Sequence, residues 1–231
     1  MNILVTGVAG FIGFSLAKNF LNKKNRIFGV DSFDEYYSKK YKQERVKELK
    51  KYDCFYFSKI DICDKKKLKS FISNKKINLI IHMAAQAGVR YSYINPKKYV
   101  NVNILGFLNL IEISKELKIK KIVYASSSSV YGDNKKFPLS ENTNCKPKNI
   151  YSVSKKLNED MADLYNKLFK INFIGLRFFT IYGEWGRPDM LIFKIFKSNI
   201  KGNKLYLNNH GNHYRDFTYI DDAVKIIEKV Y

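Results

Sequence analysis

Three glycines spaced three residues apart constrain the fold of this chain more than any other feature. Gly7, Gly10 and Gly13 stand in "TGVAGFIG", directly after the apolar run 3–5 and at the start of a helical pattern. A strand that turns this tightly into a helix needs glycine at the turn and again where the helix packs on the strand. The stretch therefore predicts a strand–turn–helix unit, which is typical of parallel α/β sheets.

Apolar runs alternate with helical patterns through most of the chain. Strand-like runs cover residues 3–5, 26–30, 54–57, 79–82, 122–125 and 174–176, and helix-like segments cover about 11–22, 40–51, 64–73, 97–118 and 151–169. Continuous apolar strands alternating with helices indicate a parallel sheet covered on both faces. We expect a doubly wound α/β Rossmann sheet over residues 1–177. A smaller, partial substrate-binding region is expected over residues 178–231, where Gly and Asn become frequent.

The glycine turn also predicts a dinucleotide site. Gly10 allows the backbone to approach a pyrophosphate, and the helix N-terminus offers N–H donors to the phosphates. Asp31, eighteen residues after Gly13, ends the second strand, where a carboxylate can hold ribose hydroxyls. A carboxylate repels a 2′-phosphate and no arginine follows it in "DSFDEYY", so the pattern favours NAD over NADP.

A tyrosine and a lysine in "YSVSK" form the second constellation. Tyr151 and Lys155 are four residues apart, so a helix places them on one face. A tyrosine with a pKa of about 10 needs positive neighbours to act as a base, and a lysine and a nicotinamide ring supply them.

A run of four serines, Ser126 to Ser129, follows the fifth predicted strand at its carboxyl end. Doubly wound sheets bind ligands at that edge, so a serine hydroxyl there can hold a substrate alcohol while Tyr151 takes its proton. His82 ends an apolar strand, and we expect a packed, hydrogen-bonded imidazole there instead of a base.

Charge and composition exclude little and indicate no special partner. The net charge of +21 is spread over lysine doublets, without an arginine-rich helix, a zinc-ligand spacing or an aromatic-basic motif, so we expect no nucleic-acid partner and no metal site. The opening "MNILVTG" reads as a strand and not as a secretory signal, and no apolar run is long enough to span a bilayer. We expect a cytoplasmic protein with no membrane partner and three reduced cysteines.

Several longer phrases resemble extended short-chain dehydrogenase/reductases: "TGVAGFIG", "HMAAQAGVRYS", "YASSSSVYG", "YSVSK", "LRFFTIYGEWGRPDM" and "RDFTYIDDAV". The chain is most similar to UDP-glucuronate 4-epimerases, including capsular-polysaccharide enzymes, over essentially its whole length. The resemblance implies a UDP-sugar substrate and a tightly held NAD. Tyr151 would remove the C4 hydroxyl proton while the C4 hydride goes to NAD, and the 4-keto sugar would turn over before hydride returns to its other face.

The same resemblance implies roles for individual residues. Lys155 would bind the nicotinamide ribose, and Ser127 matches the catalytic Ser/Thr with Ser128 close by. The implied cofactor contacts are Phe11 and Ile12 at the pyrophosphate, Asp31 and Ser32 at the adenosine ribose, Asp61 and Ile62 at the adenine, and Met83, Ala84, Ala85, Gln86 and Ala87 along the cofactor, with Asn103 supporting the site.

Substrate contacts are expected from residues that follow the sixth strand. Thr180 and Arg187 could reach the sugar, and Arg187 is the candidate for the glucuronate carboxylate, with Arg90 as its rival. Arg215 would face the UDP phosphates. A structural salt bridge stays open as the role of each arginine.

Three alternatives accompany the epimerase reading. Sugar-nucleotide 4,6-dehydratases and glucuronate decarboxylases carry an acidic residue close before "VYG", where this chain has Ser128 and Ser129, so epimerisation is favoured. The chain stops at Tyr231, earlier than such enzymes, so an NAD-binding chain without turnover is the third. Apolar residues on more than one face of helices 97–118 and 151–169 predict a homodimer.

Overall fold

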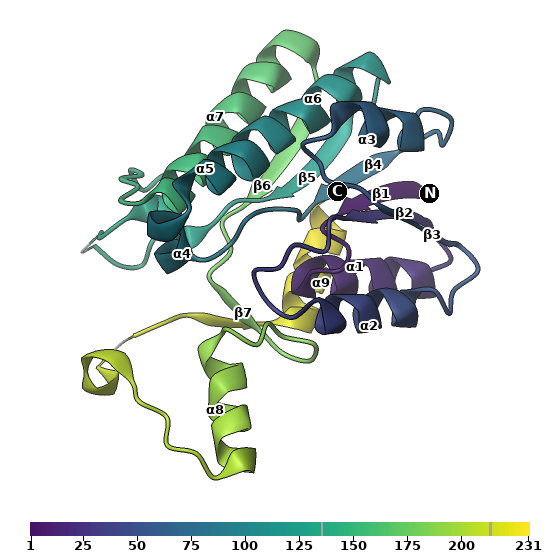
Figure 1. Ribbon diagram of the computed structural model, residues 1–231. Helices are drawn as coiled ribbons and strands as arrows, with labels where there is room; N and C mark the ends of the chain where they lie inside the picture. The colour runs from purple at the N-terminus through teal and green to yellow at the C-terminus, as the bar shows by residue number, and fades with distance from the viewer. Residues whose placement is uncertain (135, 213) are drawn as a thin grey trace.

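A six-stranded parallel sheet forms the centre of the molecule in this computed structural model, which describes residues 1–134, 136–212 and 214–231 (Figure 1). The strand order is β3-β2-β1-β4-β5-β6, and every neighbouring pair is parallel. The strands are β1 (Asn2–Thr6), β2 (Arg26–Asp31), β3 (Phe55–Lys59), β4 (Leu79–His82), β5 (Lys121–Ala125) and β6 (Asn172–Leu176). The predicted doubly wound sheet is confirmed, and the order reverses between β1 and β4.

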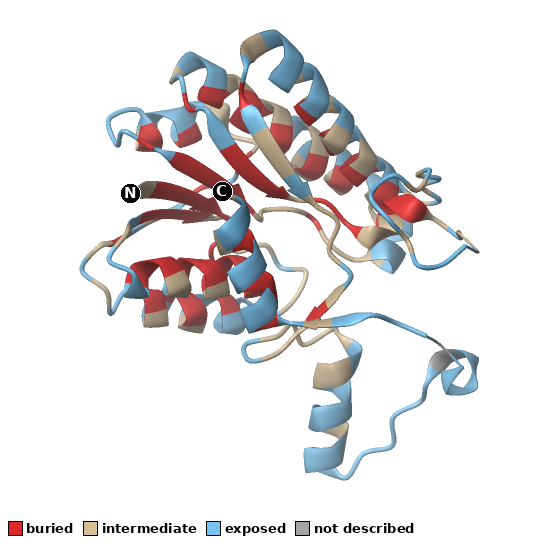
Figure 2. Cartoon of the chain, turned by 180° about the vertical axis from the view of Figure 1, so that it is seen from behind, coloured by how far each residue is buried: buried red, intermediate tan, exposed pale blue. Residues whose placement is uncertain are grey.

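Helices cover both faces of this sheet. On one face lie α1 (Phe11–Asn22), α2 (Lys39–Leu49) and α9 (Ile220–Val230), and on the other lie α3 (Lys65–Ile72), α6 (Gly106–Glu116) and α7 (Ile150–Phe169) (Figure 1). Each layer has its own buried apolar core, one built around Phe14 and Phe20 of α1 and the other around Leu110 and Ile113 of α6. The four inner strands β1, β2, β4 and β5 are mostly buried because both of their faces are covered, whereas the edge strands β3 and β6 are partly exposed (Figure 2).

The segment expected as one helix over 97–118 is a continuous helical run with a wider turn in its middle. After the short α4 (Val89–Ile94) come α5 (Pro96–Tyr99), a π-helical stretch over Val100–Leu105, and then α6. A π-helical turn inserts a residue and re-aims side chains, and such turns are frequent at functional sites. Asn103 lies within this stretch, and its side chain is buried.

The last part of the chain leaves the sheet and then returns to it. The helix α8 (Leu191–Lys201) lies below the main body in Figure 1, and the two-stranded parallel sheet of β7 (Thr180–Tyr182) and β8 (Phe217–Tyr219) lies at the lower edge of that body. Helix α9 packs against α1 and shares its core through Val224 and Ile227. The domain boundary near residue 178 stays a prediction, with the finding that residues 220–230 pack into the core of the first region.

No helix in the described part of the chain is long and apolar enough to cross a membrane. Cys54, Cys63 and Cys145 are free thiols, as predicted.

Candidate active site

The glycine turn lies at the carboxyl end of β1, and its backbone geometry requires glycine at two positions. Gly7 has a φ of 68°, and a Cβ there would lie 2.6 Å from the backbone nitrogen of Ala84. A Cβ on Gly13 would lie 2.3 Å from the Gly7 carbonyl oxygen. Glycine is therefore needed at Gly7 for backbone conformation and space, and at Gly13 for close helix–strand contact.

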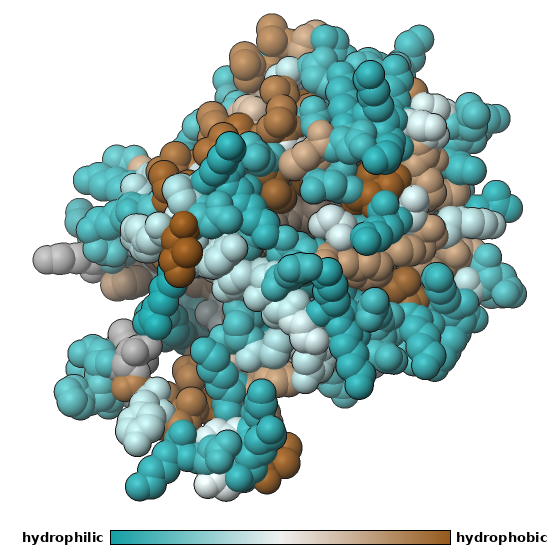
Figure 3. Space-filling model, viewed as in Figure 1, coloured by the Kyte–Doolittle hydropathy of each residue, from teal (hydrophilic) through white to brown (hydrophobic). Residues whose placement is uncertain are grey.

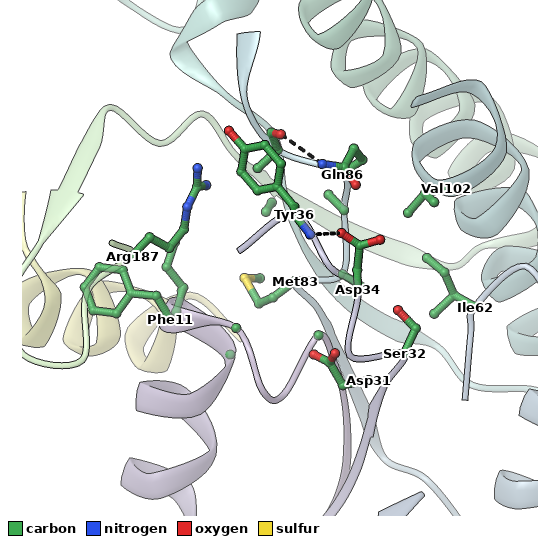
Figure 4. Close-up of a pocket in the computed structure, with 18 of the residues that line it drawn as sticks. Phe11, Asp31, Ser32, Asp34, Tyr36, Ile62, Met83, Gln86, Val102 and Arg187 are labelled. Atoms are coloured by element: carbon green, nitrogen blue, oxygen red, sulfur yellow. Dashed lines mark hydrogen bonds between the residues drawn. The ribbon is translucent and has the colours of Figure 1, made fainter. Parts of the chain in front are cut away.

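A cavity of about 300 Å³ opens above this turn, along the crevice where the strand order reverses (Figure 4). It brings together most of the residues predicted from the sequence, which come from turns at the ends of β1, β2, β3, β4 and β5, from α1 and α7, and from the segment that follows β7. The predicted residues that line it are Gly7, Gly10, Phe11, Ile12, Gly13, Asp31, Ser32, Asp61, Ile62, Met83, Ala84, Ala85, Gln86, Ala87, Ser127, Tyr151, Lys155 and Arg187.

Asp31 connects the end of β2 to the glycine turn. Its carboxylate accepts hydrogen bonds from the backbone N–H groups of Ala9 at 3.1 Å and Phe33 at 2.8 Å. Burial raises the pKa of this carboxyl, while the two N–H donors and the nearby cations Lys42 and Arg45 lower it. A carboxylate fixed at this place suits the ribose hydroxyls of a dinucleotide. The preference for NAD over NADP stays a prediction.

Tyr151 and Lys155 are positioned by the first turn of α7. Asn149 caps that helix: its side-chain oxygen accepts the Ser152 N–H at 2.9 Å, and the Ser152 hydroxyl oxygen accepts the Asn149 N–H at 3.1 Å. Lys155 is 2% exposed, and its ammonium group donates to the Ala125 carbonyl at 2.8 Å. This bond ties α7 to the end of β5.

Burial affects the charges of Tyr151 and Lys155 in addition to the expected effect of Lys155 and the nicotinamide ring. Burial lowers the pKa of Lys155 to about 8 and raises the pKa of Tyr151. The rise for Tyr151 is opposed by a hydrogen bond with the Ser127 side chain and by the positive charge of Arg187. Arg187 thus contributes to the field that was predicted from Lys155 and the nicotinamide ring.

The serine run bends at the end of β5, so that its residues have different surroundings. Ser127 lines the cavity, and its hydroxyl oxygen accepts the Ser129 N–H at 3.2 Å. Ser126 also lines the cavity, and its hydroxyl donates to Glu159 at 2.6 Å. Ser128 does not line the cavity, and its backbone N–H donates to the Phe178 carbonyl at 2.8 Å.

Asn103 lies behind the cavity and does not line it. Its side-chain oxygen accepts the Gln86 N–H at 2.7 Å, and its amide donates to the Gln86 carbonyl at 3.2 Å and to Ser154 at 2.9 Å. Asn103 therefore fixes the segment after β4 against α7, which is a supporting role and not direct contact with the cavity. His82 also has a structural role, as predicted: its ring stacks on Phe107, hydrogen-bonds Thr6 at 2.7 Å, and has its pKa lowered to about 3 by burial.

Among the arginines proposed to meet the substrate, only Arg187 reaches the cavity in the described structure. Its guanidinium forms an ion pair with Asp189, with Nε 3.0 Å from Oδ1, and lies over the Tyr36 ring. Arg90 is exposed outside the cavity, and Arg215 is exposed and donates to the Tyr214 carbonyl. Thr180 lies on β7 and does not line the cavity either.

Sequence reasoning missed a group of residues that follow Asp31. Asp34 and Tyr36 line the cavity (Figure 4). Tyr37 and Lys42 line it too, together with Lys98, which pairs with Asp34. Lys42 is 6% exposed and donates to the Asp34 carbonyl at 2.6 Å. For Asp34, Tyr36 and Tyr37 the available signal was their position, because the loop that follows β2 lies at the ligand-binding edge of the sheet.

Comparison with known proteins agrees with this geometry. Residues 3–231 match the model of the NAD dependent epimerase/dehydratase family. The chain belongs to this family. NAD, predicted from the glycine turn and Asp31, is confirmed as the cofactor of the family, and neighbouring structures were solved with NAD bound.

Several known proteins are similar to this chain in sequence or in structure. Protein CapI of Staphylococcus aureus is 44% identical over 231 residues, covering 100% of this chain and 69% of CapI. UDP-glucuronate 4-epimerase 4 of Arabidopsis thaliana is 42% identical over 230 residues, covering 97% of this chain and 52% of that protein. The crystal structure of Bacillus cereus UDP-glucuronic acid 4-epimerase with UDP-glucuronic acid and NAD has a TM-score of 0.93 at 34% identity, covering 100% of this chain and 74% of that one. The predicted resemblance is confirmed.

Proposed function

We propose that this family member epimerises a nucleotide sugar at C4, with UDP-glucuronate as substrate and UDP-galacturonate as product. The observation that carries the proposal is one cavity that joins the glycine turn and Asp31 to Tyr151, Ser127 and Lys155. The named relatives that are UDP-glucuronate 4-epimerases support the substrate. The relative CapI supports a role in capsule or cell-surface polysaccharide precursor synthesis.

The proposed chemistry assigns a proton to Tyr151. Bound NAD would supply a reversible hydride acceptor, so the cycle is redox-neutral. The Tyr151 oxygen takes the proton of the sugar C4 hydroxyl and returns it after the 4-keto sugar has turned over. Ser127 hydrogen-bonds the same hydroxyl, and its contact with Tyr151 favours the ionised tyrosine. Lys155, whose ammonium group donates to the Ala125 carbonyl, would hold the nicotinamide ribose.

Arg187 is the proposed contact for the glucuronate carboxylate. It lines the cavity, and its positive charge acts on Tyr151. The ion pair with Asp189 orients its guanidinium and leaves donors of the fork for a second carboxylate. Arg187→Ala should therefore raise KM for UDP-glucuronate more than it weakens binding of UDP-glucose. An equal effect on both sugars would assign Arg187 to a structural salt bridge.

Within the described ranges of the chain, the cavity lacks the acidic residue that elimination and decarboxylation are expected to need before "VYG". Ser128 and Ser129 stand where the acidic residue of those enzymes is expected. Among the described residues, the carboxylates that line the cavity are Asp31 and Asp34, at and after the end of β2, and Asp61, after the end of β3. Asp189, the acid nearest to Arg187, is held in an ion pair.

Product analysis tests the proposal. The protein is incubated with NAD and UDP-glucuronate, and the sugar nucleotides are separated and identified by NMR. We expect UDP-galacturonate, with no net gain in absorbance from reduced nicotinamide. Carbon dioxide with a UDP-pentose would identify a decarboxylase. In a parallel incubation with dTDP-glucose or UDP-glucose, a 4-keto-6-deoxy sugar would identify a dehydratase. NAD binding without any product would support the alternative of a cofactor-binding chain without turnover.

A further inference from the structure

One buried cation near the cavity has no part in the proposed chemistry. Arg45 extends from α2 and is 0% exposed. One guanidinium nitrogen, Nη1, donates to the Ala9 carbonyl at 2.9 Å and to the Tyr37 hydroxyl at 2.8 Å. The other, Nη2, donates to the carbonyls of Trp185 and Gly186, the latter at 3.3 Å. In the described part of the chain, no carboxylate lies within ion-pair distance of it.

The acceptors of Arg45 belong to two functional segments that are far apart in the sequence. Ala9 lies in the glycine turn, between Gly7 and Gly10. Trp185 and Gly186 directly precede Arg187, which reaches the substrate end of the cavity. Arg45 therefore connects the segment that receives the pyrophosphate with the segment that carries the cation beside Tyr151.

The second segment needs such support because its backbone is strained. Trp185 has a φ of 59°, in the left-handed region that a bulky side chain rarely adopts. Its indole ring packs against Phe14 of α1, with ring centroids 5.2 Å apart. A residue held in this conformation persists only where its surroundings over-determine it, and here the contacts come from Arg45 and Phe14.

We propose that Arg45 is a positioning residue that fixes the Trp185–Arg187 turn to the glycine turn and so sets the place of Arg187 in the cavity. Burying a charge without a counter-ion is costly, and packing alone would be served by an apolar residue. Only the planar fork of arginine can meet these four acceptors together, since a lysine ammonium is a point charge. The Nε–H of Arg45 is buried and has no partner among the described residues. The orientation of the guanidinium therefore satisfies the four acceptors and leaves this donor unpaired.

The inference does not depend on which sugar nucleotide is the substrate. It concerns how the cofactor turn and the Arg187 segment are joined, and it predicts coupling between them in the NAD-binding protein. Trp185 is the only tryptophan in the chain, so intrinsic tryptophan fluorescence reports on this turn alone.

The test compares Arg45→Lys with the matched variant Arg177→Lys. Arg177 is a part-buried arginine that pairs with Glu159 and donates to the Glu141 carbonyl, and in the described part of the chain no hydrogen bond or ion pair joins its side chain to either turn. Arg45→Lys should shift Trp185 emission to the red and increase its quenching by acrylamide. It should also raise the Kd of NAD about three- to tenfold, because the lysine loses some of the charge-assisted hydrogen bonds that Arg45 donates. Arg177→Lys should change neither the emission nor the Kd.

Two results would overturn the inference. One is unchanged Trp185 quenching and NAD affinity in a folded Arg45→Lys protein, and the other is an equal change in both variants, which would reflect general loosening. If Arg45→Lys does not fold, amide hydrogen exchange of the wild-type protein tests whether NAD binding is coupled to the Trp185–Arg187 turn. NAD should slow exchange at Gly186, whose N–H donates to the Gly183 carbonyl at 3.1 Å, and an unchanged Gly186 rate would reject the coupling.

Discussion

Burial shifts the pKa values of Tyr151 and Lys155 in opposite directions, and both shifts work against the charged forms. Tyr151 therefore depends on cationic neighbours to become a base near neutral pH. Arg187 is one such neighbour in the structure, and bound nicotinamide would be another. At the scale of single residues, the site is a balance between desolvation and a few nearby charges.

Removal of the Tyr151 hydroxyl should stop turnover while the cofactor stays bound. Tyr151→Phe keeps the ring, which packs edge-on against Tyr99, and deletes only the oxygen that exchanges the proton. We expect a loss in kcat of at least about 100-fold, since general acid–base catalysis contributes ~10²–10⁴-fold. Calorimetry should show NAD affinity close to that of wild type. Ser127→Ala should lose less, and a variant Tyr151→Phe with near-normal kcat would exclude Tyr151 as the base.

Lys155 should make the stability of the NAD-free protein depend on pH in a defined window. Its pKa falls from 10.5 to about 8 on folding, so between these values the unfolded chain binds the extra proton and the free energy of unfolding rises with pH. Relative to Lys155→Met, the wild type should gain up to about 3 kcal/mol across that window, from 1.36 kcal/mol per pKa unit. Urea unfolding at several pH values measures it. Lys156→Met, which removes a surface partner of Asp160, is the control, and a flat difference for Lys155→Met would contradict the prediction.

At the scale of elements, α9 illustrates how adjacent residues on one helix differ in their contribution. Ile227 is 0% exposed in the core shared with α1, whereas its neighbour Ile226 is 50% exposed. Ile227→Ala should lower the free energy of unfolding by about 2–5 kcal/mol, and Ile226→Ala by much less, because only the first leaves a cavity. Denaturant unfolding of both variants provides the comparison. Equal, small losses would mean that α9 is not packed on the sheet domain in solution.

At the scale of the whole molecule, one face of α7 remains apolar and uncovered. Val153, Leu157, Leu164 and Leu168 are 37–61% exposed and share a helical face, and Figure 3 shows hydrophobic residues gathered over the upper helices of this view. A homodimer stays a prediction, and this face is where a second copy would pack. Light scattering should give a dimer mass for the wild type and a monomer mass for Leu164→Asp. Ile195→Asp on α8, where the wild-type side chain is 46% exposed, should remain dimeric. A monomeric wild type at micromolar concentration would contradict the prediction.

The sequence by itself determined the features that depend on local spacing. The glycine turn, the carboxylate at the end of β2, and the Tyr151–Lys155 pair follow from the strand and helix periods, so the sheet and the cofactor could be predicted from residue order. The serine run could be placed at the ligand-binding edge because the carboxyl ends of all the parallel strands meet there.

Only the tertiary structure decided which side chains turn toward the cavity and what neutralises them. Asp34 and Tyr36 lie in the loop between β2 and α2, and Lys42 lies on α2; the path of that loop depends on contacts with distant residues such as Lys98. Arg90 and Arg215 had the right charge for a substrate but are directed elsewhere, whereas Arg45 meets carbonyls at 9, 185 and 186. Sequence periodicity specifies which face of an element is apolar, but the partners of a buried charge come from remote segments, and folding alone brings those segments together.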